Sequence, residues 1–286
     1  MVATLHRFDS VAASAPKTSD EARHLLEQGN LASARTNGFG SLNKTSHSER
    51  QDPGVVGRDR SAPVQSPFAA LLGCADARVP PEFVFSKGSN ELFVVRVAGN
   101  VLGQECLGSM RYAVSHFSKT LKLLVVLAHA NCGAVTEAVD LYLEPGRYIN
   151  SATDYSVRSI EDQILVAVRT AALSLEAVYG PKVTKKPCFR AASLEVALVL
   201  NAAWSAYCLR QEFIGKFPLL GVVFGAYDLI SGLVRLPLSP PGQLTKKEKG
   251  LFVPPMDATG FRQLALRICK GHLIRSLMAP ARRRAA

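Results

Sequence analysis

Residues Leu121–Val135 read LKLLVVLAHANCGAV, and this stretch decides the fold class. Its first part, Leu121–Ala128, is a short apolar run, which is typical of a strand buried on both faces. A helical pattern follows at about Ala134–Leu143. A buried strand that leads directly into a helix indicates an α/β fold with a mainly parallel sheet.

The rest of the chain repeats this alternation of apolar runs and helical patterns. Further strands are expected at Phe68–Gly73, Leu92–Ala98 and Leu219–Phe224, and further helices at about Ser109–Phe117, Ile160–Tyr179 and Leu194–Phe213. The segment Gly232–Leu236 is expected to return as an antiparallel edge strand. The sequence therefore predicts a mostly parallel central sheet, with about four parallel strands plus the edge strand, flanked by helices.

No internal repeat or second apolar core divides the chain, so we expect one large domain. We predict a flexible tail over residues 1–20 and an N-terminal helical arm with a polar connector over residues 21–66. A single α/β domain is expected over residues 67–278, and a basic tail over residues 279–286. Within the arm, the helix is expected from about Ser19 to Gly29.

Composition limits the partners and the compartment. The net charge is +11, but no nucleic-acid-binding signature accompanies the basic residues, so we read the excess near the C-terminus as a solvated surface without a specific nucleic-acid partner. The longest apolar runs are too short for a membrane span. The first 20 residues lack the pattern of a secretory signal, and we expect a cytoplasmic protein.

We do not expect the six cysteines to form a disulfide framework, because a cytoplasmic compartment is reducing. A cluster among them would instead indicate a metal or a catalytic site. Four of them are expected to act as small apolar core residues and not as ligands: Cys106, Cys188, Cys208 and Cys269.

The other two cysteines follow the ends of two predicted strands. Cys74 comes directly after Phe68–Gly73, while His129 and Cys132 come after Leu121–Ala128. The carboxyl ends of adjacent parallel strands open on one crevice, so these three side chains are expected to meet there. Two thiolates and one imidazole suit zinc, and three protein ligands leave a fourth position open, as in a catalytic site. We therefore expect the α/β domain over residues 67–278 to be a zinc-binding catalytic domain.

Asp76 and Arg78 follow Cys74 at alternate positions and would point to the same side of an extended chain. Asp76 is a candidate fourth zinc ligand. If its carboxylate is paired with Arg78, it is instead held away from the metal and can accept a hydrogen bond. The sequence leaves both possibilities open.

The region from Gln65 to Val139 resembles the signature region of β-class carbonic anhydrases. The resemblance is carried by QSPFAALLGCADARVPPEFVF, ELFVVRVAGN, GSMRYAV and LLVVLAHANCGAV, in that family's order and spacing, and more weakly by GVVFGAYDLISGLV. It implies that Cys74, His129 and Cys132 bind one zinc ion per chain, and that Asp76 and Arg78 form a catalytic carboxylate–guanidinium pair. It also implies that Gln65 donates a hydrogen bond to the substrate.

Two features depart from the family pattern. Ala75 and Ala77 stand where the family usually has serines, and Leu31–Ala32 replaces the Arg-Phe that normally follows the family's L-x-x-G-N element. In the family this N-terminal arm wraps a partner subunit, so the resemblance implies a homodimer or a higher homo-oligomer.

The function implied by the resemblance is the reversible hydration of carbon dioxide to bicarbonate by zinc-bound hydroxide, which makes the chain a zinc-dependent lyase, a carbonate dehydratase. Two alternatives stay open. One is hydrolysis of carbonyl sulfide or carbon disulfide on the same scaffold, and the other is a catalytically silent binding module stabilised by zinc.

Overall fold

The computed structural model describes residues 15–36, 64–147, 149, 153–240, 243 and 245–279. Most of the predicted N-terminal tail and connector, and nearly all of the predicted basic C-terminal tail, therefore lie outside the described residues. The described ranges contain a central sheet and the helices that pack around it.

One five-stranded sheet forms the centre of the domain, in the spatial order β2-β1-β3-β4-β5. Its strands are β1 (Ala69–Gly73), β2 (Leu92–Arg96), β3 (Leu123–His129), β4 (Gly221–Tyr227) and β5 (Val234–Arg235). The first four are parallel, and β5 pairs antiparallel with β4. The predicted fold class is confirmed, with each strand within a few residues of its expected position.

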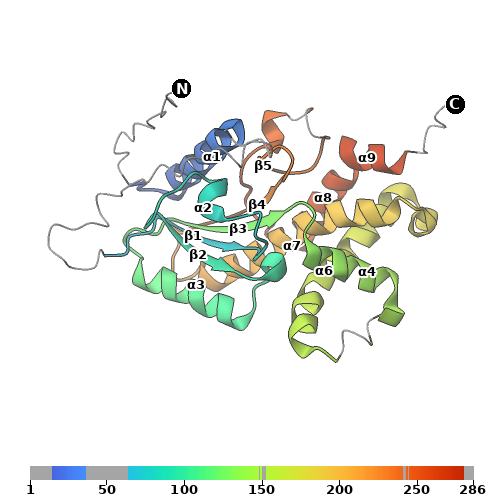
Figure 1. The fold of residues 1–286 in the computed structure, drawn as a ribbon, viewed down its shortest axis with the longest axis horizontal. Coiled ribbons are helices and arrows are strands. Elements are labelled where there is room, and N and C mark those ends of the chain that lie inside the picture. Colours follow the sequence, from blue (N-terminus) through green and yellow to red (C-terminus); the bar gives the residue numbers. More distant parts are fainter. Residues whose placement is uncertain are drawn as a thin grey trace, which may run out of the picture.

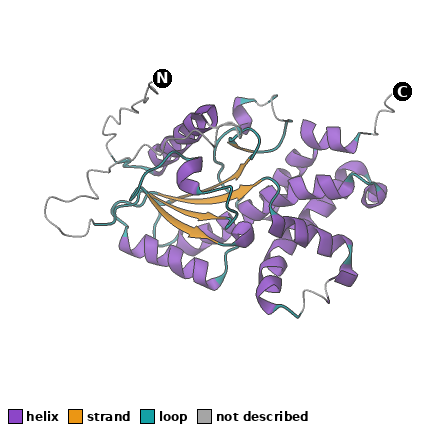
Figure 2. Ribbon diagram, viewed as in Figure 1, coloured by secondary structure: helices purple, strands orange, loops and turns teal. Residues whose placement is uncertain are grey.

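Helices surround this sheet. They are α1 (Ser19–Thr36), α2 (Pro81–Val84), α3 (Gln104–His116), α4 (Gly133–Leu143), α6 (Tyr155–Tyr179), α7 (Phe189–Phe213), α8 (Ala258–Cys269) and α9 (His272–Met278). Helices α1 and α3 lie on opposite sides of the sheet, and α4, α6, α8 and α9 gather beside it (Figure 1). The four parallel strands point toward this group of helices (Figure 2), so the carboxyl ends of the strands face it.

Helix α7 packs against β3 and β4 and forms the centre of the helical side. It is long and apolar enough to cross a membrane, but 72% of its most apolar window is buried inside the domain. A helix that is apolar on most sides and buried by its neighbours has the composition expected of a core helix.

Helix α1 is longer than predicted, because it continues past Gly29 to Thr36. Close packing explains why a glycine is tolerated inside it: a Cβ on Gly29 would lie 1.9 Å from the carbonyl oxygen of Phe85. The next residue, Asn30, is 3% exposed and donates to the carbonyls of Val84 and Gly232 at 3.1 and 2.9 Å. Its Oδ1 accepts from the amide of Val234 at 2.8 Å. The described part of the arm is thus fixed to its own domain.

Helices α8 and α9 were not predicted as helices, because their many basic residues were read as a solvated surface. The basic side chains of Arg262, Arg267 and Arg275 are exposed, as expected. They stand, however, on helices whose other faces bury Ile268 and Ile274 completely. The charge belongs to the outer face of the packed domain.

Candidate metal centre

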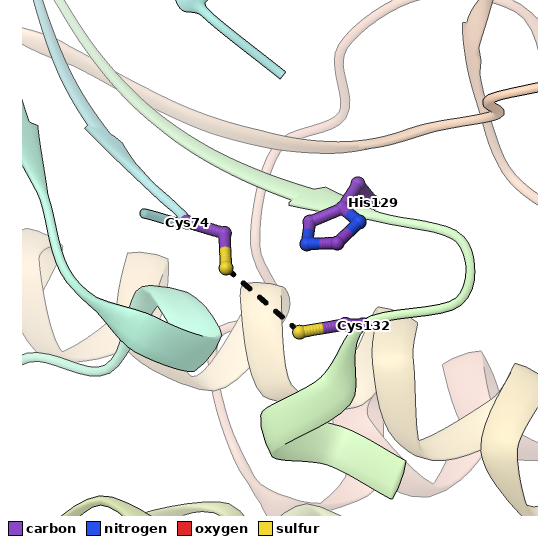
Figure 3. Close-up of side chains that lie close together, drawn as sticks. All are labelled: Cys74, His129 and Cys132. Carbon is purple, nitrogen blue, oxygen red and sulfur yellow. Dashed lines mark hydrogen bonds between the residues drawn. The ribbon is translucent and has the colours of Figure 1, made fainter. Parts of the chain in front are cut away.

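Three potential metal ligands meet at the carboxyl ends of β1 and β3. Cys74 is the first residue after β1, His129 is the last residue of β3, and Cys132 is the N-cap of α4. Their side chains point toward one another, as Figure 3 shows, and each is at most 5% exposed. The predicted convergence of these residues is confirmed.

The distances fit a shared cation. All three ligand atoms lie within 4.8 Å of one another, and the two sulfurs are 3.9 Å apart. This separation is far longer than a disulfide bond of about 2.05 Å. Two thiolates at about 2.3 Å from a tetrahedral zinc ion would lie roughly 3.8 Å apart. The sulfurs are therefore already spaced as zinc requires.

The imidazole of His129 is oriented for ligation. Its Nδ1 lies 2.9 Å from the carbonyl oxygen of Ala130, and because a carbonyl only accepts, Nδ1 carries the hydrogen. The lone pair is then on Nε2, which is buried and has no hydrogen-bond partner among the described residues. An orphaned buried nitrogen is costly unless it binds something. A carbonyl that fixes the other ring nitrogen is the usual support for a metal-binding histidine.

The two thiols are coupled electrostatically. The pKa of Cys74 lies well below the ordinary thiol value, chiefly because the Cys132 thiol donates to its thiolate. The pKa of Cys132 is correspondingly raised by the same bond and by burial. One sulfur is thus readily ionised, and a divalent cation is the group that would stabilise both as thiolates.

Asp76 is withheld from this cluster by Arg78. The guanidinium donates through Nε to Oδ1 at 2.9 Å and through Nη2 to Oδ2 at 2.6 Å. Arg78 holds the pKa of the Asp76 carboxyl well below its usual range, so the carboxylate stays ionised. Its Oδ2 nevertheless lies only 3.8 Å from Nε2 of His129. The structure thus favours the second of the two roles considered for Asp76: a carboxylate beside the metal position that is not itself one of the three convergent ligands.

Two further contributions to this geometry were not predicted from the sequence. Arg96, the last residue of β2, donates to the backbone carbonyls of Cys74, at 3.0 Å, and Asp76. Asn131 has a left-handed backbone with φ 55°, and its carbonyl accepts from Nη2 of Arg78 at 3.2 Å. An arginine at the carboxyl end of a strand beside β1 was the available signal for the first. No sequence signal indicated the second.

Gln65 is not brought together with these residues. It precedes β1 and is exposed, whereas Cys74 follows β1, so the full length of the strand separates them within one subunit. The other four cysteines are also apart from the cluster and carry free thiols. Burial raises the pKa of Cys269 to about 12, which fits its predicted role as an inert core residue.

A sequence model of one protein family, described as carbonic anhydrase, matches residues 69–232. This segment is more than half of the chain and contains both strand ends of the cluster. The chain belongs to the β-class carbonic anhydrase family. Members of this family use zinc, and Cys74, His129 and Cys132 are the group that could hold it here.

Individual relatives share the same region. Carbonic anhydrase 2 of Mycobacterium tuberculosis is 39% identical over 99 residues, which are 34% of this chain and 47% of that protein. A carbonic anhydrase of Mycolicibacterium smegmatis is 36% identical over 121 residues, or 42% of this chain and 57% of that protein. The chain thus spans about half the length of these relatives.

Solved structures of the family also align with the chain. The β-carbonic anhydrase CcaA aligns at a TM-score of 0.47 and 18% identity, over 70% of this chain and 91% of that one. Two tetrameric β-carbonic anhydrases of Sordaria macrospora give a TM-score of 0.45 at 20% identity, over 74% of this chain and 94% of the matched chain.

Proposed function

We propose that the protein catalyses the reversible hydration of carbon dioxide, in which carbon dioxide and water give bicarbonate and a proton. The observation that carries the proposal is the pairing of three convergent buried ligands with a carboxylate that Arg78 holds aside. A purely structural zinc site is usually closed by a fourth protein ligand. Here the nearest candidate, Asp76, is bound to a guanidinium.

Each residue of the site has a separate task. Cys74, Cys132 and Nε2 of His129 would hold zinc, and the two thiolates would balance its charge. Zinc, when bound, supplies the Lewis acidity that makes water nucleophilic near neutral pH. The ionised Asp76 accepts a hydrogen bond from the nucleophile and so orients it, while Arg78 keeps Asp76 from becoming a ligand.

Gln65 would donate a hydrogen bond to the substrate oxygen, as in part of the family. Because β1 separates it from Cys74 in the same subunit, this role requires Gln65 to act on a neighbouring subunit's site. We accordingly propose a homodimer or a higher homo-oligomer, and a cytoplasmic location. The tetrameric relatives of Sordaria macrospora are in line with self-association.

The test is a stopped-flow assay of the purified protein, with its zinc content measured in the same preparation. Carbon dioxide is compared with carbonyl sulfide and carbon disulfide. We expect rapid hydration of carbon dioxide and little turnover of the sulfur compounds. A zinc-loaded protein that turns over none of the three would be a silent binding module, and preference for a sulfur compound would make it a hydrolase.

A further inference from the structure

A cavity lies beside the metal centre, beyond the carboxyl ends of β3 and β4. Its volume is about 230 Å³, and it is separated from the three ligands by the turn that joins His129 to Cys132. Its polar lining includes Asn131 from this turn, Glu195 from α7, Asp228 directly after β4, and Arg235 from β5. No step of the proposed hydration uses it.

Two of these charged residues satisfy each other. Arg235 donates through Nε and Nη2 to Oδ2 of Asp228, at 2.9 and 2.8 Å, and through Nη1 to the carbonyl of Ser239. Asp228 also accepts from the amide of Ile230 at 3.0 Å and from the hydroxyl of Ser231. Both side chains are at most 7% exposed. This pair is complete without a ligand.

Glu195 is different, because no donor among the described residues reaches its carboxyl group. Its half-buried position raises its pKa, with burial as the largest cause and the charges of Arg235 and Asp228 as smaller, opposing ones. The guanidinium of Arg235 is already committed to Asp228 and Ser239. The Glu195 carboxyl group is thus a half-buried acceptor on the cavity wall, unpaired among the described residues, and a cation that enters the cavity would find it free to bind.

The remaining lining is mainly apolar and limits what kind of cation fits. It consists of Leu198 on α7, Tyr227 at the end of β4, Leu229 and Ile230 after β4, Pro237, Leu273 on α9, and the alanines of β4 and the turn. Ile230 is 70% exposed, which is unusual for a large apolar residue and places it at the mouth. A hydrated metal ion would gain nothing from these walls, whereas an alkyl chain would bury apolar surface on them.

The cavity shares a wall with residues that orient the metal centre. Ala130 and Asn131 form one of its walls. The carbonyl of Ala130 accepts from Nδ1 of His129, and the carbonyl of Asn131 accepts from Arg78. An occupant that presses on this turn therefore acts on the residues that orient a zinc ligand and restrain Asp76.

We propose that this cavity binds a small organic cation, of the class of short primary alkylamines, with its ammonium group on Glu195 and its alkyl chain on the apolar walls. Occupancy changes the rate of the metal centre through the Ala130–Asn131 turn. The binding claim stands without the proposed hydration activity, and only the effect on rate rests on it.

The test is calorimetric titration of the full, zinc-loaded protein with n-butylammonium at about pH 8, where the amine is cationic. The neutral control ligand is n-butanol, which keeps the alkyl chain and lacks the charge. Glu195→Gln removes the carboxylate and keeps its size, and Glu195→Asp keeps the charge on a shorter side chain. Glu82→Gln is the matched control variant, because Glu82 is exposed on α2, outside the cavity.

We expect n-butylammonium to bind in the millimolar range and n-butanol not to bind. Glu195→Gln should weaken binding about tenfold or more, because it removes a charge-assisted hydrogen bond. Glu195→Asp should weaken binding less, and Glu82→Gln should leave it unchanged. Absence of heat with the wild-type protein up to about 50 mM amine, equal binding of the alcohol, or unchanged binding by Glu195→Gln would each overturn the proposal. The hydration rate with and without amine is then measured on the same samples.

Discussion

Replacing Arg78 with alanine is the most informative single change, because this residue decides whether Asp76 stays beside the metal position or closes it. The pair is held by two charge-assisted hydrogen bonds, at 2.9 and 2.6 Å. Without the guanidinium, Oδ2 of Asp76 would be a free anion 3.8 Å from Nε2 of His129. A carboxylate in that position is expected to become a fourth ligand.

The expected loss of activity in Arg78→Ala follows from the strength of the Asp76–Arg78 pair. Hydrogen bonds to charged groups contribute about 1.5–3 kcal/mol each in favourable settings. The side chain of Arg78 is 45% exposed, so solvent screening reduces the total to about 1–3 kcal/mol. Loss of this restraint shifts the balance toward the closed arrangement by roughly 5- to 150-fold. We therefore expect the kcat of carbon dioxide hydration to fall by about that factor, with the zinc content unchanged.

The assay is stopped-flow hydration together with zinc analysis of the same sample. Arg78→Lys should keep part of the activity, because one ammonium can hold one oxygen of Asp76 but cannot grip both. Arg158→Ala, which removes a half-buried arginine of α6 that is paired with Asp162 and lies outside the ligand cluster, is the control and should have no effect. Near wild-type activity in Arg78→Ala would refute the reasoning, and loss of zinc would show that Arg78 supports the ligands themselves.

Three other changes test separate parts of the structure. Cys132→Ser should weaken zinc binding by more than about 100-fold in a chelator competition, whereas Cys208→Ser, which lies outside the ligand cluster, should not; equal affinities would remove Cys132 from the ligand set. Asn30→Ala should lower the free energy of unfolding by about 3 kcal/mol, because it leaves two buried carbonyls and one amide without their hydrogen-bond partner. Gln263→Ala, at an exposed position, is the control. A similar melting temperature for both variants would contradict the stabilising role of the Asn30 hydrogen bonds. Asp140→Asn should destabilise the protein at neutral pH by about 1 kcal/mol, because Arg190 grips the carboxylate and lowers its pKa below the ordinary value of 3.8. This stabilisation exists above the unfolded pKa and disappears as the pH falls through the folded one, so urea titrations of wild type and variant should converge in acid; a constant difference down to acid pH would refute the assignment.

Much of the sheet and of the ligand cluster could be predicted from the sequence, because the signals are local. Apolar runs of strand length end at Cys74 and His129, and parallel strands necessarily place such ends at one edge. The antiparallel edge strand at Val234–Arg235 could also be predicted from a local signal, the short segment Gly232–Leu236 that follows the last parallel strand. The conjunction of these positions, more than any one of them, identified the metal centre.

The features that could not be predicted depend on contacts between distant segments. Arg96 supports Cys74 from the neighbouring strand, and its place at the end of β2 does not by itself show which backbone carbonyls its side chain reaches. Helix α8 does carry a local signal, because Asp257 caps its first turn by accepting from the amide of Gly260 at 2.8 Å. That signal was hidden by the surrounding basic residues. Glu195 lies in an apolar helical pattern, and only the folded chain reveals that its carboxyl group has no partner among the described residues.

The most direct test of the zinc site is X-ray absorption spectroscopy at the zinc edge on the purified protein, combined with the measured zinc stoichiometry. We predict one zinc ion per chain with two sulfur neighbours, one histidine nitrogen and one light atom from solvent, at the distances of a tetrahedral site, about 2.3 Å for sulfur and about 2.0 Å for nitrogen. A spectrum without two sulfurs, or a crystal structure at the pH of activity in which Asp76 occupies the fourth position, would contradict it.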